Sequence, residues 1–288
     1  MEGTGEDRVT AIRRVALIFD DRLRSDTAGV YCRRALAELV RVAHFRPRQL
    51  EAIPPGFDLY VNVDEGLRYR LPARLRPSAW WAIDTHLDFP WYRTKAPDFD
   101  FVFAAQRDGA KRLCREVCPA TWLPLACDPH VHRKHERPKR FDVAFVGNLV
   151  CRERAELLGL VQEHFPQSFA GRCYGDAMAE VYSASRTVFN RSVLNDVNMR
   201  VFEAVACGSL LVTNDLASNG QEELLHEGRH LAVYRSAGEL VEKIAWYLAH
   251  EDERERIAAA GRSEALRRHT YHHRMETLLG EMERRVRC

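Results

Sequence analysis

The sequence lacks the patterns that define several common classes of protein. Its eight cysteines include no CxxC pair, so neither a zinc site of that kind nor a disulfide framework is indicated. No apolar run approaches the roughly 20 residues that a membrane-spanning helix needs. The charged amino terminus is not followed by the apolar segment of a signal peptide. We therefore expect a cytoplasmic chain without a membrane span, because isolated cysteines fit a reducing cytosol.

An excess of one charge is missing too. Lys and Arg number 43 and Asp and Glu 41, which leaves a net charge of +2. Such a chain has no global field that attracts nucleic acid or an anionic membrane, so any anion site is local. The basic run at 133–140 is a single short segment. It makes nucleic-acid binding the weakest functional hypothesis.

What is present is an alternation of short apolar runs with helix-like segments. The 288 residues, 46% of them hydrophobic, suffice for two domains. Strands are predicted at 15–20, 57–63, 79–84, 99–105, 141–147, 168–171, 187–190 and 209–214. Helical spacing predicts helices at 27–42, 152–164, 197–206, 236–268 and 271–287. Strands that alternate with helices favour parallel sheets covered on both faces.

A polar, proline-bounded stretch at 124–140 separates the two alternating patterns. We expect a flexible basic linker there, between an α/β domain at 1–128 and a second at 129–270, with a terminal helix at 271–288. Two Rossmann-like domains of this kind leave a crevice at the carboxyl ends of their strands, where ligands bind. His130, His132 and His135 lie in this stretch, but without a cysteine partner the spacing does not favour zinc.

The most informative segment is the predicted helix that begins near residue 197. At 100° per residue, Asp196, Arg200 and Glu203 share one face. A helix amino terminus with Arg200 would attract a pyrophosphate, and Glu203 could accept hydrogen bonds from ribose hydroxyls. The alternative interpretation is a solvated face on which Arg200 and Glu203 form an i,i+3 ion pair.

The segment NMRVFEAVACGSLLVTND (198–215) resembles the nucleotide-sugar segment of group 1 glycosyltransferases with the GT-B fold, and is most similar to the spore-maturation (CgeB-like) branch. FVGNLVCRERAELL (145–158) resembles the glycine turn that opens the second domain of that family. WLPLACDPHVH (122–132) resembles its interdomain segment. One difference is that many retaining members carry two glutamates with seven residues between them, whereas Asn195 holds the position paired with Glu203.

The resemblance implies that the second domain binds the donor, the first binds the acceptor and the terminal helix crosses back onto the first domain. Glu203 would hold the ribose, Arg200 and Arg152 would contact the diphosphate, and the segment with Tyr174 would flank the base. The donor-site residues expected on this basis are Glu203, Arg200, Asn198, Asp196, Arg152, Gly147, Asn148 and Tyr174.

Two segments of the first domain carry candidate residues. Gly29 and Tyr31 lie in a segment that resembles the family's acceptor-side loop, although a single glycine after a strand is common. Asp84 and His86 follow a predicted strand, and we expect them to be catalytic because an imidazole there could relay a proton. Trp91 could stack on an acceptor sugar. The same histidine could instead bond a carboxylate in a structural loop.

The prediction is therefore a glycosyltransferase of the hexosyltransferase type that moves a sugar from a nucleoside diphosphate sugar to an unidentified acceptor. We expect neither a metal nor a cofactor, because basic groups and helix dipoles can neutralise the leaving diphosphate. Two alternatives remain: a non-catalytic module that binds a nucleotide-sugar or a partner protein, and a GT-B-type nucleotide-sugar epimerase.

Overall fold

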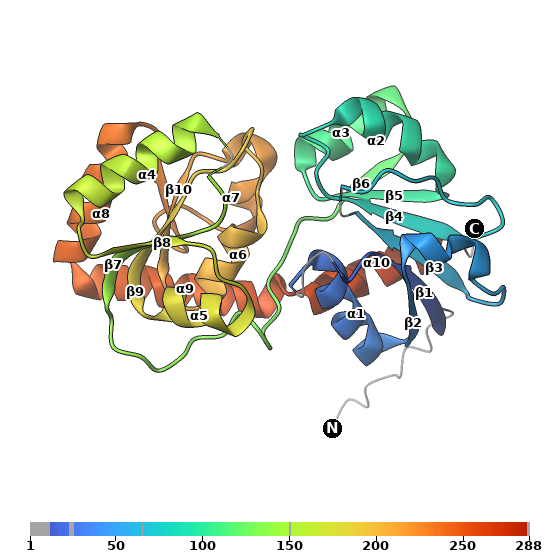
Figure 1. Cartoon of the computed structure of the whole chain (residues 1–288), viewed down its shortest axis with the longest axis horizontal. Coiled ribbons are helices and arrows are strands. Elements are labelled where there is room, and N and C mark those ends of the chain that lie inside the picture. The colour runs from blue at the N-terminus through green and yellow to red at the C-terminus, as the bar shows by residue number, and fades with distance from the viewer. Residues whose placement is uncertain (1–11, 23–25, 65, 150, 287–288) are drawn as a thin grey trace, which may run out of the picture.

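A computed structural model describes residues 12–22, 26–64, 66–149 and 151–286. Within them the chain forms two α/β domains side by side, each built on a parallel sheet (Figure 1). The described strands of the first sheet run in the order β2-β1-β3-β4-β5-β6, all parallel. Their bounds are β1 Arg14–Ile18, β2 Arg41–Phe45, β3 Leu59–Val63, β4 Ser78–Ala82, β5 Phe101–Ala104 and β6 Ala120–Trp122.

Helices cover both faces of the first sheet, whose central strands β3 and β4 are mostly apolar. All five residues of β3 and of β4 are buried, as expected for strands sandwiched between helices. The helices of this domain are α1 Ala28–Leu39, the 3-10 helix η1 Pro47–Ala52, α2 Phe89–Lys95, the 3-10 helix η2 Ala96–Asp98 and α3 Arg107–Glu116. On one face, Trp80 stacks on Tyr92 of α2, with ring centroids 5.2 Å apart.

The second domain repeats this architecture with its strands in the order β11-β10-β9-β7-β8, again all parallel. Its strands are β7 Phe141–Val146, β8 Ser168–Gly171, β9 Ser185–Asn190, β10 Leu210–Asn214 and β11 Ala232–Tyr234. Its helices are α4 Arg152–His164, α5 Gly175–Ser183, α6 Met199–Ala206, η3 Ala217–Asn219, α7 Gln221–Leu224, α8 Ala237–Ala249 and α9 Glu251–Arg268. Helix α6 therefore begins at the carboxyl end of β9, where it can face a ligand.

The chain passes between the domains twice, and the two passages are bonded to each other. The Cys127 N–H donates to the His269 carbonyl at 3.0 Å, and the Tyr271 N–H donates to the Cys127 carbonyl at 2.9 Å. Helix α10, Tyr271–Val286, then packs against α1 of the first domain (Figure 1). The buried Arg274 of α10 donates to the carbonyls of Pro124 and Leu125. One apolar cluster runs through this joint from the first domain into the second.

The structure differs from the predicted elements at three places. The helix expected at 27–42 ends at Leu39, and residues 41–45 form the edge strand β2, because the apolar spacing there fits either structure. The helix expected at 236–268 is broken at His250, whose backbone is not helical (φ −114°, ψ 74°). His132, expected in a flexible linker, is completely buried. Residues 1–11 of the expected first domain and 287–288 of the expected terminal helix lie outside the described residues.

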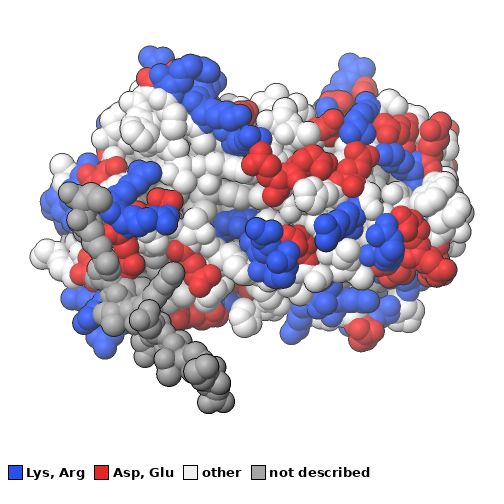
Figure 2. All heavy atoms as spheres, turned by 180° about the vertical axis from the view of Figure 1, so that it is seen from behind, with Lys and Arg blue, Asp and Glu red and all other residues white. Residues whose placement is uncertain are grey.

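Two observations bear on the expected partners. Among the described helices, none combines the length and the apolar character needed to cross a membrane. Basic and acidic side chains are interspersed over the face seen in Figure 2. In the basic run, Arg133 pairs with Asp176 at 3.0 Å and Lys139 donates to the carbonyl of Ser185 at 2.8 Å. Two of the basic side chains at 133–140 are therefore already bonded to groups of the protein itself.

Candidate functional site

A cavity of about 500 Å³ lies between the domains. Its walls come from segments that follow β1, β3 and β4 in the first domain and β7, β8 and β9 in the second, together with the start of α6. Because all these strands are parallel, the segments meet at the carboxyl edges of the two sheets, where α/β folds bind ligands.

Arg200 projects from the first turn of α6 toward the end of β7. Its Nε donates to the Val146 carbonyl at 2.9 Å, and its Nη1 donates to Oδ1 of Asn190 at 2.6 Å. The guanidinium lies over the Phe145 ring, 4.7 Å from the centroid. A Cβ on Gly147 would lie 2.2 Å from Arg200 Nη2, so only glycine leaves space for this side chain.

Arg154 brings a second guanidinium to the same wall from the first turn of α4. The residue is buried, its Nε donates to the Arg191 carbonyl at 2.8 Å, and its Nη1 donates to the Asn148 carbonyl at 2.8 Å. Burial, and then the nearby Arg200, lower the pKa of Arg154. Among the described residues, no carboxylate lies within salt-bridge distance of either Arg154 or Arg200. The two charges are therefore suited to an anionic ligand.

Glu203 lines the cavity one turn further along α6 and is buried. The i,i+3 ion pair of the alternative interpretation does not form, since Arg200 bonds to Val146 and Asn190 instead. Asn198 is the N-cap of α6 and lines the cavity, although its side chain makes no capping bond. The arrangement leaves the amino terminus of an eight-residue helix open to the cavity.

The loop before α6 holds an uncommon backbone conformation at the cavity. Leu194 and Asn195 have φ values of 50° and 59°, which cost a leucine of order 1 kcal/mol or more. Hydrogen bonds fix the loop: the Val193 N–H donates to Oδ1 of Asp196 at 2.8 Å, and Nδ2 of Asn219 donates to the Asn195 carbonyl at 3.1 Å. These bonds hold Asp196 in the cavity wall.

The wall from the first domain is organised by the buried Asp64, which follows β3. Its Oδ2 accepts a hydrogen bond from the Ile83 N–H at 3.0 Å and another from the Tyr92 hydroxyl. These bonds fix the segment that follows β4, in which Asp84 and His86 line the cavity. The structure therefore brings both predicted catalytic residues to the crevice.

His86 and Asp196 come from opposite domains and influence each other electrostatically. Burial lowers the pKa of His86, although Asp196 and Asp108 act in the other direction. Burial raises the pKa of Asp196, opposed first by His86. A neutral imidazole at this position could accept a proton from a ligand hydroxyl.

Several polar atoms in the cavity wall have no hydrogen-bond partner within the described protein. They are buried, and they come from both domains: Thr27 Oγ1, His86 Nδ1 and Asn198 Oδ1. Buried polar atoms are normally bonded, because each unpaired atom costs of order 1–3 kcal/mol. Such a set indicates that the cavity takes a polar ligand or water.

A second contact joins the domains beside the cavity. Gln106, at the amino terminus of α3, accepts hydrogen bonds on Oε1 from the Val197 N–H at 2.9 Å and from Asn219 Nδ2 at 2.8 Å. The Asp108 N–H donates to Oδ1 of Asn219 at 3.0 Å. Arg107 and Glu223 pair at 2.6 Å. The start of α6 is thus held directly by the first domain.

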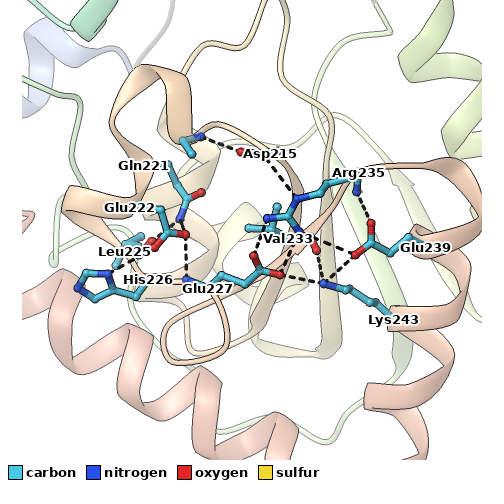
Figure 3. A network of polar contacts seen from close by, with 11 residues as sticks. Asp215, Gln221, Glu222, Leu225, His226, Glu227, Val233, Arg235, Glu239 and Lys243 are labelled. Atoms are coloured by element: carbon cyan, nitrogen blue, oxygen red, sulfur yellow. Dashed lines mark hydrogen bonds and ion pairs between the residues drawn. The ribbon is translucent and has the colours of Figure 1, made fainter.

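The segment that carries Asn219 is also anchored within its own domain (Figure 3). Arg235 lies 3.4 Å from Asp215 and 2.9 Å from Glu227. Lys243 of α8 pairs with Glu227 at 2.9 Å and with Glu239 at 3.0 Å. This network fixes both ends of the segment 215–235 and so supports the interdomain contact.

Four of the predicted residues lie away from the cavity. Arg152 is 91% exposed and pairs with Glu156 at 2.6 Å. Gly29 is packed under Phe19, since a Cβ there would lie 2.3 Å from the ring. Tyr31 is buried beside Tyr271. Trp91 lies beside Arg68, which is 5.7 Å from the centre of its ring. The other predicted residues, His86, Asp84, Glu203, Arg200, Asn198, Asp196, Gly147, Asn148 and Tyr174, all line it.

Sequence reasoning missed Arg154, although a signal for it exists. Arg154, Leu158 and Val161 are the buried residues of α4 and follow the i, i+4, i+7 spacing of one helix face. That spacing places Arg154 on the inner face and Arg152 on the outer face. Gln106 and Asn219 were also missed, and no local pattern distinguishes them, because the two bond to each other across the domains.

One group of side chains has the composition of a metal site. The ligand atoms of His135, Asp176 and Glu180 lie within 4.8 Å of one another. Arg133 pairs with Asp176 and Arg137 pairs with Glu180. Two guanidinium groups thus already neutralise the carboxylates that a cation would need, and the group does not favour a metal.

A wider hollow of about 690 Å³ lies between α4 and the start of α8. Its charged side chains are paired with each other, as in Arg191–Glu153 at 2.6 Å and Arg235–Asp215 at 3.4 Å. Among the described residues, the hollow therefore lacks guanidinium groups without an ion-pair partner, such as Arg154 and Arg200 of the interdomain cavity. The chemistry points to the smaller cavity as the functional site.

Comparisons with known proteins identify the family of the chain and its fold. A family model described as glycosyl transferase-like matches residues 130–280. Among curated proteins, none has a significantly similar sequence. Anabaena Alr3699/HepE, solved with UDP and glucose, superimposes with a TM-score of 0.70 at 12% identity, covering 94% of this chain and 99% of that one.

Two further solved structures have the same architecture. Sucrose-phosphate synthase from Thermosynechococcus elongatus gives a TM-score of 0.64 at 13% identity, with 95% of this chain and 99% of that one covered. An alpha-glucosyltransferase in complex with UDP and a 13-mer DNA gives 0.65 at 11% identity, with 94% and 98% covered. These likenesses confirm the GT-B fold that the sequence predicted.

Proposed function

We propose that this chain, which belongs to the glycosyl transferase-like family, transfers a sugar from a nucleoside diphosphate sugar to an acceptor held between its domains. The observation that carries the proposal is the pair of guanidinium groups, Arg154 and Arg200, which face the cavity without a carboxylate ion pair among the described residues. Arg200 in the first turn of α6 and Arg154 in the first turn of α4 would together neutralise a diphosphate.

In this proposal the two domains have different roles. Arg154, Arg200 and the amino terminus of α6 stabilise the negative charge that develops on the leaving diphosphate. Glu203 accepts hydrogen bonds from the ribose, and Tyr174 at the rim flanks the base. Asp84 and His86 face the transferred sugar and the acceptor from the first domain. Because these protein groups would themselves neutralise the charge of the diphosphate, we propose that transfer requires neither a metal nor a cofactor.

The finer assignments belong to the same proposal. The segment 198–215 supports the CgeB-like branch, and the sugar is proposed to be a hexose. The cytoplasmic location is supported by the described cysteines, all of which are free thiols. The acceptor is a glycan, a protein or a small molecule that binds against the first domain.

The proposal is tested by thermal shift with UDP, GDP, dTDP, ADP and CDP, with and without EDTA. UDP is the first probe because similar folds were solved with it. A ligand that binds only the folded state raises the melting temperature. We expect one nucleotide to do so regardless of EDTA, and Glu203→Ala to abolish the shift. Glu156→Ala, on the exposed face of α4, is the matched control.

A measurement of turnover distinguishes a glycosyltransferase from the alternative, a non-catalytic module that binds a nucleotide-sugar. UDP release from UDP-glucose, measured in pure protein, is expected if the chain is a transferase, since slow hydrolysis of the donor accompanies transfer. Tight nucleotide binding with no release from any nucleotide-sugar would favour the binding module. No shift with any nucleotide would remove the main support for both.

A further inference from the structure

His132 lies in the passage between the domains, directly behind Glu203. Its side chain is 0% exposed, and its Nε2 lies 3.6 Å from Oε1 of Glu203. The edge of its ring meets Tyr31 of α1, with centroids 5.2 Å apart and planes at 77°. The His132 ring, which belongs to the linker, therefore lies against both α1 of the first domain and α6 of the second.

The hydrogen bonds of the ring define its tautomer. The Asp128 N–H donates to Nδ1 of His132 at 2.9 Å, so Nδ1 is unprotonated and Nε2 carries the hydrogen. Burial, and then the nearby Arg34, lower the pKa of His132 to about 3, which keeps the ring neutral at pH 7. The ring therefore directs a single N–H toward the Glu203 carboxylate.

This N–H has no hydrogen-bond partner within the described protein. The separation of 3.6 Å exceeds a hydrogen bond, but a movement of less than about 1 Å would close it. A carboxylate that accepts two ribose hydroxyls must hold a defined plane, and a donor behind it restricts its rotation. Hydrogen bonds of this kind often tighten only when the ligand binds.

We propose that His132 is a positioning residue of the donor site, whose Nε2–H holds the Glu203 carboxylate in the orientation that accepts the ribose hydroxyls. The inference rests on the proposed function, because it assigns the ribose to Glu203. It adds that recognition of the ribose depends on the linker between the domains as well as on α6.

The test compares the binding of UDP and 2′-deoxy-UDP by calorimetry. Loss of a hydrogen bond to a charged group costs about 1.5–3 kcal/mol, so wild-type protein should prefer UDP by roughly 10-fold or more. In His132→Phe the preference should fall to within about 3-fold, with the affinity for 2′-deoxy-UDP almost unchanged. His132→Gln, which can still donate an N–H, should recover part of the preference.

His130→Phe is the matched control, since His130 lies in the same turn with its side chain 65% exposed. A folded His132→Phe protein that keeps the wild-type preference would overturn the inference alone. If the variants do not fold, the inference is tested instead by a long-range ¹H–¹⁵N spectrum of the wild-type histidines, recorded with and without UDP. A ring that is charged, protonated at Nδ1 or unaffected by UDP overturns it. Wild-type protein that binds no nucleotide would instead refute the proposed function first, and this inference with it.

Discussion

Gln106 of the first domain accepts a hydrogen bond from the backbone N–H of Val197 in the second domain, at 2.9 Å. Val197 precedes the N-cap of α6, the helix that carries Arg200 and Glu203. The same oxygen of Gln106 accepts from Asn219. The buried amide of Gln106 therefore joins the start of α6 to the first domain.

Gln106→Leu should weaken both the interdomain contact and the donor site. The change leaves the Val197 N–H without its acceptor, at a cost of about 1–3 kcal/mol, and removes one of the two acceptors of Asn219 Nδ2. We expect a lower melting temperature, a larger radius of gyration by small-angle X-ray scattering and weaker binding of UDP. Gln167→Leu, at an exposed position, is the control. A variant that matches wild type in all three would show that the contact is dispensable.

Arg154→Gln should lower the affinity for UDP by roughly 10- to 100-fold, because one charge-assisted contact to the diphosphate is lost. Arg152→Gln, two residues earlier on the exposed face of the same helix, should stay within about 2-fold. Calorimetry at low and moderate salt measures both, and the Arg154 effect should shrink as salt rises. Equal effects of the two changes would contradict the assignment.

Gly147→Ala should weaken ligand binding and also lower stability, because the φ of 153° at Gly147 is one that residues with a side chain rarely adopt. The added Cβ would lie 2.2 Å from Arg200 Nη2, so Arg200 must leave its place above the Phe145 ring. We expect UDP affinity to fall by roughly 10-fold or more, with the loss of the Arg200 contact. Gly159→Ala, where nothing lies within 4 Å of the new Cβ, is the control. Unchanged affinity in a folded Gly147→Ala protein would argue against a role for Arg200.

His86→Asn should reduce turnover without reducing the affinity for UDP. His86 lines the cavity from the first domain, whereas Arg154 and Arg200 line it from the second. General acid–base groups contribute roughly 10²–10⁴-fold to a rate. We therefore expect a fall of that order in kcat for UDP release from UDP-glucose, with the Kd for UDP within about 2-fold. A parallel loss of affinity would place the imidazole in donor binding instead.

The free energy of unfolding should fall between pH 7 and pH 5. Burial lowers the pKa of His132 to about 3 and that of His269 to about 4, against an ordinary value of 6.5. The unfolded imidazoles bind protons below pH 6.5 that the folded ones do not, so acid favours unfolding. The loss at pH 5 is roughly 2 kcal/mol for each histidine.

Urea unfolding at the two pH values measures this effect. His132→Gln removes one of the histidines whose pKa burial lowers, so the stability of the variant should depend less steeply on pH than that of the wild type. A variant with the same pH dependence as the wild type would show that His132 is not the group responsible.

Local pattern accounts for much of the fold and for one wall of the site. The predicted helix at 197–206 is α6 Met199–Ala206, and the expected polar stripe brings Asp196, Arg200 and Glu203 to the cavity. These predictions succeed because helical spacing depends only on neighbours in the chain. The edge strand β2 was missed, since Val40 and Val42 fit the helical spacing equally well.

The sequence by itself determined the alternation of strands and helices, the GT-B architecture and the position of the helix α6 with its polar stripe. Only the tertiary structure decided that Arg154 rather than Arg152 faces the crevice, that Gln106 holds the start of α6, and that His132 lies behind Glu203. The physical reason is that burial and hydrogen-bond partners are set by segments distant in the chain. The same histidine can be a solvated linker residue or a buried donor, and its neighbours in space decide which.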